Sequence, residues 1–168
     1  MLDALAPFEP RLDGGWGVDA LLGEQAREHA DVDVVIARRD AHDARSRLER
    51  LGFAHDAGAV PGLPARLVFR DAAGRQVDLH LIVRDEAGNG WQQLDDGTWG
   101  RYDADGLRSW GEIGGRRVRC ISAELQLRHH RGYEWTPSDR ADMARLAERF
   151  GLAVGEAPSP SAAAPERG

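Results

Sequence analysis

The sequence predicts an α+β (mixed α/β) fold, in which a small mixed β-sheet is flanked by helices. Short apolar segments typical of strands interchange with segments whose apolar residues follow a helical period. Glycines end several of the helical segments. The chain has 168 residues, of which 42% are hydrophobic, and this composition suits one compact domain with a modest core.

The first third of the chain predicts a helix, a strand and a second helix. Gly14 and Gly15 open a short helix that stops at Gly23, and a strand follows over residues 31–37, DVDVVIA. Residues 40–53 predict the second helix, which ends at Gly52. Its apolar face would consist of Ala41, Ala44, Leu48 and Leu51.

The rest of the chain predicts a hairpin, a further strand and two helices. Residues 65–70 and 75–83 predict two strands joined by the turn DAAG, and residues 116–122 predict another strand after a hairpin turn at Gly114–Gly115. Ser122 would cap the helix over residues 123–131, and Thr136 with Pro137 would begin the last helix, which ends at Gly151. The apolar face of that last helix would consist of Met143, Leu146, Ala147 and Phe150.

Composition bounds the organisation and location of the protein. We expect one domain over residues 1–154, whose C-terminal portion, about 122–151, is helical. Residues 155–168, rich in Pro, Ala and Ser, predict a disordered tail. No apolar run is long enough to cross a membrane and no signal peptide is evident, so we expect a cytoplasmic protein without a membrane partner. Cys120 is the only cysteine and is expected to be a buried, inert thiol.

The charge pattern excludes two classes of phosphate chemistry. The net charge is −6 and no basic stripe is evident, so we expect no nucleic-acid partner. The sequence contains no lysine and therefore no Walker-type phosphate loop. Any phosphate site in this protein must use Arg, His or backbone N–H groups.

Three aspartates form the main candidate site. Asp31 and Asp33 are two residues apart on one strand and therefore point to the same face. Asp78 shares a face with His80 on a later strand, and it would join the pair if the two strands are neighbours. Three carboxylates at adjacent strands suit Mg²⁺ and phosphoryl transfer. The alternative is that these acids are solvated or cap turns.

A second candidate site is the turn before the first predicted helix. Gly14 and Gly15 would let backbone N–H groups close on an anion at a helix N-terminus. Arg27 and His29 come shortly before Asp31 and would contact phosphates beside the metal. The alternatives are a plain turn, a solvated loop and, for His29, a structural hydrogen bond.

The segments LDGGWGVDALLG, REHADVD and VDLH together resemble the minimal nucleotidyltransferases of the DNA polymerase β superfamily. They look most similar to the short lincosamide nucleotidyltransferases and the aminoglycoside 2″-adenylyltransferases. The later run CISAELQLRHHRGYEW resembles the lincosamide enzymes as well. The likeness spans roughly residues 12–150 and implies a polymerase β-like nucleotidyltransferase fold.

The resemblance also implies a role for each candidate residue. Asp31 and Asp33 would bind Mg²⁺, and Asp78 would be the third carboxylate, as a metal ligand or a general base. The residues lining the triphosphate site would be Gly14, Gly15, Trp16, Arg27 and His29. An acceptor hydroxyl would attack the α-phosphorus of ATP, or of another nucleoside triphosphate, and release pyrophosphate.

The sequence leaves the acceptor and the oligomeric state open. A lincosamide would favour the aromatic residues Trp91, Trp99, Tyr102, Trp110 and Tyr133, whereas a polycationic aminoglycoside would favour the aspartates at 95, 96, 103 and 105. Packing in the core or in loops is the alternative role for the aromatic residues. A protein acceptor and a noncatalytic nucleotide-binding relative are the other two readings, and the chain could be a monomer or a homodimer.

Overall fold

The structure is a computed structural model that describes residues 1–57, 65–94, 96–131 and 134–154. Its central sheet has the strand order β1 (Arg11–Asp13), β2 (Asp31–Ala37), β5 (Gln76–Arg84), β4 (Arg66–Arg70) and β3 (Ala54–His55). The β2–β5 pair is parallel and the other pairs are antiparallel. The predicted α+β fold with a mixed sheet is therefore confirmed, as is the hairpin between β4 and β5.

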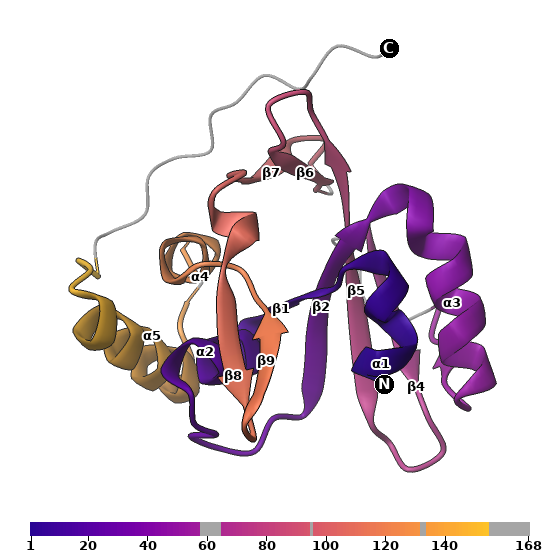
Figure 1. The fold of residues 1–168 in the computed structure, drawn as a ribbon, viewed down its shortest axis with the longest axis horizontal. Coiled ribbons are helices and arrows are strands. Elements are labelled where there is room, and N and C mark those ends of the chain that lie inside the picture. The colour runs from indigo at the N-terminus through magenta and orange to yellow at the C-terminus, as the bar shows by residue number, and fades with distance from the viewer. Residues whose placement is uncertain (58–64, 95, 132–133, 155–168) are drawn as a thin grey trace.

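Two further hairpins lie in the segment to which the sequence assigned few elements. The end of β5 pairs with β6 (Gly90–Gln93), which pairs with β7 (Trp99–Tyr102) at the top of Figure 1. The strands β8 (Trp110–Ile113) and β9 (Arg116–Arg119) form a separate sheet, and Gly114 and Gly115 turn between them with φ of 55° and 77°. That hairpin turn was predicted; β6 and β7 were missed because each is only four residues long.

Helices cover the two sides of the molecule. The α1 (Leu2–Leu5) and α3 (Ala41–Arg50) helices lie on the right of Figure 1, whereas α2 (Gly14–Leu22), α4 (Ala123–His129) and α5 (Pro137–Phe150) lie on the left. Three short 3₁₀ turns complete the described structure: η1 (Ala6–Phe8), η2 (Arg38–Asp40) and η3 (Gly106–Arg108). Among the described residues, no helix has the length and apolar character needed to cross a membrane.

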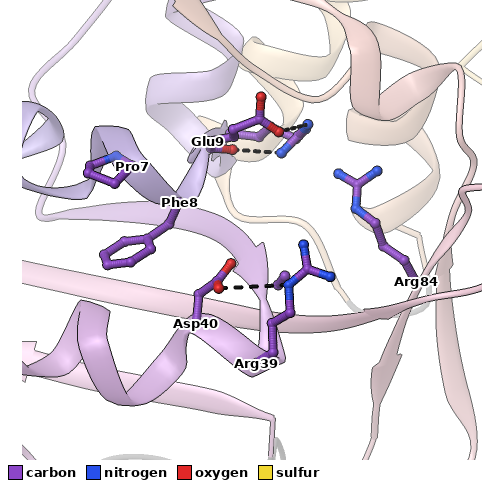
Figure 2. Close-up of a pocket in the computed structure, with 8 residues that line it drawn as sticks. Pro7, Phe8, Glu9, Arg39, Asp40 and Arg84 are labelled. Atoms are coloured by element: carbon purple, nitrogen blue, oxygen red, sulfur yellow. Dashed lines mark hydrogen bonds and ion pairs between the residues drawn. The ribbon is translucent and has the colours of Figure 1, made fainter.

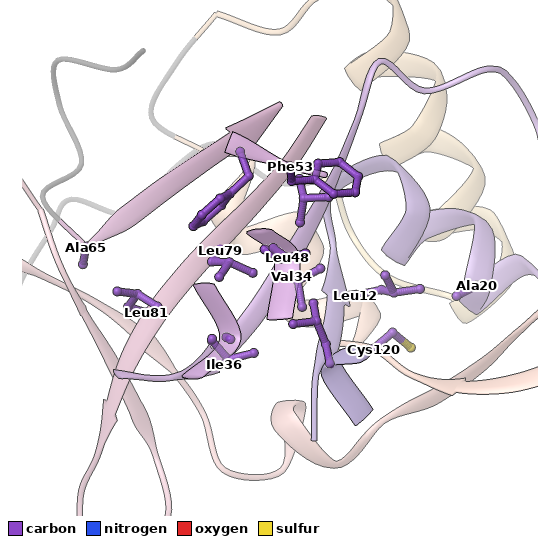
Figure 3. Close-up of a cluster of buried hydrophobic side chains, with 14 residues drawn as sticks. Leu12, Ala20, Val34, Ile36, Leu48, Phe53, Ala65, Leu79, Leu81 and Cys120 are labelled. Carbon is purple, nitrogen blue, oxygen red and sulfur yellow. The ribbon is translucent and has the colours of Figure 1, made fainter. Parts of the chain in front are cut away.

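The main core decides which face of the sheet carries the candidate site. Val34 and Ile36 of β2 pack with Leu79 and Leu81 of β5 and with Leu48 of α3 (Figure 3). Because side chains alternate along a strand, the intervening residues of β2 and β5 point to the opposite face. The core between the sheet and α3 therefore forces the aspartates of both strands onto the face away from α3.

The predicted helix caps are present. Ser122 accepts a hydrogen bond from the backbone N–H of Leu125 at 3.3 Å, and Thr136 with Asp139 forms a complete capping box at the start of α5. Each such cap contributes about 1 kcal/mol to helix stability. The helices therefore begin where the sequence predicted.

Two residues of the predicted apolar faces are exposed. Leu51 is 47% exposed because α3 ends at Arg50, so the helical period does not continue to it. Phe150 is 41% exposed at the last position of α5, where the Arg149 guanidinium lies 5.7 Å from the centre of its ring. Cys120 is fully buried as expected, but it follows the end of β9, and burial raises the pKa of its thiol to about 12. The predicted tail, residues 155–168, lies outside the described residues, and the domain limits stay a prediction.

Candidate functional site

The register of the sheet brings the predicted aspartates together. Asp33 of β2 is paired with Asp78 of β5 on one side and with Asp13 of β1 on the other. One carboxylate oxygen from each of Asp31, Asp33 and Asp78 can be chosen so that all lie within 4.8 Å of one another. The expected convergence of these three residues is therefore confirmed, and Asp13 is a fourth acid in the same row.

The charges around these carboxylates differ from one to the next. Burial raises the pKa of Asp31, and the neighbouring charges of Asp33 and Asp78 raise it further. Burial also acts to raise the pKa of Asp33, but a hydrogen bond from His80 and the charge of Arg66 lower it below its ordinary range. Among the described residues, Asp33 therefore has a histidine partner that Asp31 lacks.

Asp78 is held from two sides. It is fully buried, it accepts hydrogen bonds from Gln76 Nε2 at 2.9 Å to each of its oxygens, and it forms an ion pair with Arg66. Arg66 Nε is buried and has no hydrogen-bond partner among the described residues. The Arg66 guanidinium therefore lies beside one of the three carboxylates that would bind a cation.

The donor set fits a hard divalent cation. All three groups supply carboxylate oxygen, the ligand that Mg²⁺ prefers, and one or two carboxylates with substrate phosphates are its usual protein environment. Burial raises the pKa of Asp31, and the charges of Asp33 and Asp78 raise it further, so these carboxylates repel one another. A bound cation would offset that repulsion.

The glycine turn before α2 lies directly against the carboxylates. Asp13 caps α2 by accepting a hydrogen bond from the Gly14 N–H at 2.7 Å, and Gly14 has a φ of 57°. A Cβ atom at Gly14 would overlap Asp33 Oδ2. The N-terminus of α2, where backbone N–H groups are free to bind anions, therefore faces the predicted metal site.

The predicted phosphate-binding side chains gather at the next glycine. A Cβ atom at Gly15 would overlap the imidazole of His29 and lie 2.9 Å from Arg27 Nη2. The Trp16 and His29 ring centres are 5.0 Å apart. The turn, Trp16, Arg27 and His29 thus form one cluster, and their contact with a phosphate stays a prediction.

Two buried acids that the sequence reasoning missed hold these side chains in place. Asp19 of α2 is fully buried and its Oδ2 lies 2.5 Å from His29 Nε2, which confirms the alternative of a structural hydrogen bond for His29. Asp142 of α5 accepts hydrogen bonds from Arg27 Nη2 at 2.8 Å and Nε at 3.1 Å. Asp19 stands among the apolar residues of α2, which was a usable signal, whereas nothing local marked Asp142.

The aromatic residues considered for acceptor binding differ in their burial and contacts. Trp91 is buried and donates to Asp85 at 3.0 Å, and Trp110 is 42% exposed beneath two arginines, so both fit the packing alternative. Trp99 is half-buried on β7, and Tyr133 lies outside the described residues. Tyr102 is buried, connects through Gln92 and His80 to Asp33, and stacks edge-on with His129 at 4.3 Å.

A cavity of about 270 Å³ lies elsewhere, at the C-terminal ends of β2 and β5 (Figure 2). Arg39 and Arg84 reach it from the sheet side, and Phe8 and Glu9 line it from the N-terminal segment. Burial, together with the nearby charges of Arg84 and Arg119, lowers the pKa of Arg11 in its wall to about 10. None of the predicted site residues lines this cavity.

Comparison with known proteins identifies relatives over most of the chain. The sequence profile of the aminoglycoside-2″-adenylyltransferase family matches residues 3–146. A lincosamide resistance protein from Staphylococcus haemolyticus is 33% identical over 135 residues, which are 80% of this chain and 81% of that protein.

Solved structures agree with the sequence relatives. The crystal structure of the lincosamide antibiotic adenylyltransferase LnuA with lincomycin bound has a TM-score of 0.73 and 30% identity, and the match covers 86% of this chain and 90% of that one. The crystal structure of ANT(2″)-Ia with adenylyl-2″-tobramycin has a TM-score of 0.67 at 20% identity, covering 89% and 85%, and supports the shared fold. The resemblance drawn from the sequence is confirmed: the chain belongs to the aminoglycoside-2″-adenylyltransferase family.

Proposed function

We propose that this protein is a Mg²⁺-dependent adenylyltransferase that moves AMP from ATP to a hydroxyl group of a small antibiotic of the lincosamide class. The observation that carries the proposal is the group of three carboxylates on adjacent strands, with oxygens within 4.8 Å of one another, beside the glycine turn of α2. Membership of a family of antibiotic adenylyltransferases supports it. The aspartate pair and the later single aspartate supply the ligands that a nucleotidyl transfer needs.

The residues of the chain suggest how the transfer proceeds. Asp31, Asp33 and Asp78 would hold the Mg²⁺ ions, which when bound neutralise charge on the phosphates and the carboxylates. The N–H groups at the start of α2 would bind the phosphates, with Arg27 and His29 beside them. The acceptor oxygen bonds to the α-phosphorus of ATP, the bond from that phosphorus to the bridging oxygen breaks, and pyrophosphate leaves.

Asp78 is the group that we assign to the proton of the acceptor hydroxyl, in addition to its role as a ligand. Its side chain is fully buried and is engaged by Arg66 and Gln76. Arg66 donates to Oδ2 of Asp78 alone, and Gln76 Nε2 donates to both oxygens, so one of these donors must move when Asp78 accepts a proton. We therefore expect Arg66 to change partner when nucleotide and metal bind, and to meet a phosphate or the acceptor instead.

Two of the four acids expected to attract an aminoglycoside are already paired with arginines, which favours the lincosamide class, whereas Asp95 lies outside the described residues. Asp103 is paired with both Arg101 at 2.9 Å and Arg128 at 2.5 Å, and Asp105 is paired with Arg108 at 2.9 Å. A polycationic acceptor would have to displace these arginines. Tyr102 is buried and packs edge-on against the half-buried ring of His129, so this part of the site is aromatic rather than acidic.

Pyrophosphate release from ATP and Mg²⁺ tests the proposal, with a lincosamide and an aminoglycoside as alternative acceptors. We expect release with the lincosamide, loss of release in Asp33→Asn, and normal release in the matched control Asp105→Asn, whose side chain is 94% exposed. Release with the aminoglycoside alone would overturn the acceptor class. Equal release by Asp33→Asn would overturn the catalytic site, and substitution of CTP, GTP or UTP for ATP checks the nucleotide.

A further inference from the structure

A buried chain of polar side chains runs from the β6–β7 hairpin to the carboxylate cluster. Tyr102 of β7 donates from its hydroxyl to Gln92 Oε1 at 2.9 Å. Gln92 Nε2 lies 3.2 Å from His80 Nδ1, and His80 Nε2 lies 3.0 Å from Asp33 Oδ1. Tyr102 and Gln92 are 3% and 4% exposed, so water does not compete for these contacts.

The carbonyl oxygen of Ala65 fixes the direction of the whole chain. It lies 3.4 Å from Gln92 Nε2 and can only accept a hydrogen bond, so the Gln92 amide must keep its NH₂ group on that side. The same NH₂ group faces His80 Nδ1, which must then be the acceptor. In the neutral ring the proton of His80 is therefore on Nε2, where it is donated to Asp33. Burial acts to lower the pKa of His80, and the hydrogen bond and charge of Asp33 raise it overall, whereas the Gln92 donor at Nδ1 opposes a second ring proton.

Tyr102 reinforces this arrangement from the other end. Burial raises the pKa of the Tyr102 phenol, and the charges of Asp13 and Asp33 raise it further, so the hydroxyl keeps its proton. The single phenol proton has two acceptors beside it, Gln92 Oε1 and Asp13, and in the arrangement that donates to Gln92 every donor of the chain points toward Asp33. A rotated Gln92 amide would place two acceptor oxygens, its own and that of Ala65, against each other.

The two carboxylate oxygens of Asp33 therefore have different neighbours. Oδ1 accepts from His80, whereas Oδ2 is the atom that a Cβ at Gly14 would overlap, so it faces the glycine turn. Hydrogen bonds to the second oxygen of a ligating carboxylate commonly orient it and tune metal affinity. Here those hydrogen bonds begin on a hairpin that carries none of the aspartates.

We propose that Gln92 and Tyr102 are positioning residues for the transfer reaction: they hold His80 with its proton on Nε2, and His80 in turn holds Asp33 with Oδ2 presented toward the glycine turn. This inference rests on the proposed function of the carboxylates. It gives the β6–β7 hairpin a part in catalysis beyond contacts with an acceptor.

The first test reads the His80 tautomer directly. Two-bond ¹H–¹⁵N correlation spectra of the full-length protein distinguish a protonated ring nitrogen from a bare one, and the His80→Asn variant identifies the His80 signals. The proposal expects a protonated Nε2 and a bare Nδ1 in the wild-type protein without nucleotide. Gln92→Met should lose that pattern, whereas Gln93→Met, a substitution on the opposite side of β6, should keep it.

The second test separates positioning from packing. For Gln92→Met we expect the Mg²⁺ concentration for half-maximal pyrophosphate release to rise by up to roughly 10-fold, the lower end of the range for losing a direct partner of a metal ligand, because Gln92 acts through His80; kcat at saturating Mg²⁺ should change far less. Gln93→Met should match the wild-type protein. Tyr102→Phe retains the Ala65 contact that orients Gln92, so we expect the His80 pattern to persist and a smaller rise in the Mg²⁺ requirement.

The outcomes are separable from those of the proposed function. If wild-type His80 carries its proton on Nδ1, or on both nitrogens, the positioning role is overturned whatever the activity. An equal Mg²⁺ requirement for Gln92→Met and Gln93→Met in folded proteins overturns it as well. If the wild-type protein releases no pyrophosphate with any acceptor, the proposed function is overturned. The expected His80 tautomer would then have no role in catalysis, even if it is observed.

Discussion

Replacing Asp31 by Asn should stabilise the metal-free protein while removing its activity. Asp31 is half-buried and faces Asp33 and Asp78, and burial with these two charges raises its pKa. The asparagine keeps the shape of the side chain and removes the repulsion. Transfer activity should be lost because one of the three oxygen ligands becomes a neutral amide.

The size of the effect follows from the spacing of the carboxylates. At 4.8 Å, one pair of unit charges repels by roughly 1–3.5 kcal/mol for an effective dielectric between about 80 and 20. Arg66 offsets part of this, and solvent screens the half-exposed Asp31 further. We expect a net gain of about 1 kcal/mol, which raises Tm by roughly 2–4 °C for a domain of this size.

The pH dependence has a defined sign. Between the ordinary aspartate pKa and the raised value of Asp31, the folded protein binds more protons than the unfolded chain, so the contribution of Asp31 to stability falls as pH rises through this window. The advantage of Asp31→Asn should therefore be largest at neutral pH and vanish below the ordinary aspartate pKa.

Thermal unfolding in EDTA, followed by circular dichroism, measures the difference between Asp31→Asn and the wild-type protein, with Asp105→Asn as the surface control. Mg²⁺ with ATP should then reverse the order, because a ligand at a hundred times its Kd stabilises the wild-type protein by about 2.7 kcal/mol. A Tm for Asp31→Asn at or below that of the wild-type protein in EDTA would refute the claim that the cluster is electrostatically strained.

Three further substitutions or reactions test other parts of the structure. Gly15→Ala should lower kcat/KM for ATP by roughly 10- to 100-fold, because its Cβ would displace the histidine and arginine that lie against it; steady-state kinetics at fixed acceptor would show the change. Gly111→Ala should destabilise the fold by about 1–3 kcal/mol because its Cβ would overlap the backbone oxygen of Ala20, and urea unfolding beside Gly100→Ala, which has space for a Cβ, measures it. Cys120, with a thiol pKa of about 12 and no exposure, should react with a thiol reagent only after unfolding, and rapid labelling of the native protein would contradict its burial.

The strands that carry the aspartates could be predicted because each has a strong local pattern. DVDVVIA alternates acids with valines before a continuous apolar run, and the strand with Asp78 alternates from Gln76 to Leu81 before the apolar residues Ile82 and Val83. Once β2 and β5 were assumed to be neighbours, the carboxylate cluster followed. Their parallel pairing, with Asp33 opposite Asp78, had to come from the structure.

The partners of those residues could not be predicted, because they are long-range. Arg66 reaches Asp78 across a hairpin, and Asp142 reaches Arg27 from the last helix. The β6 and β7 strands lack a period long enough to recognise, and their pairing depends on the extension of β5 beyond the sheet. The exposed ends of α3 and α5 show the complementary error, in which a helical period was continued past the last residue that packs.

The ion pair between Arg27 and Asp142 also sets the order in which the site is completed during synthesis. Asp31, Asp33 and Asp78 are all synthesised well before α5. Asp142, the partner of Arg27, is synthesised 115 residues after Arg27. A nascent chain that ends before α5 holds the carboxylates without the acid that fixes Arg27 beside Gly15. Arg27 can therefore gain this partner only after α5 has been synthesised.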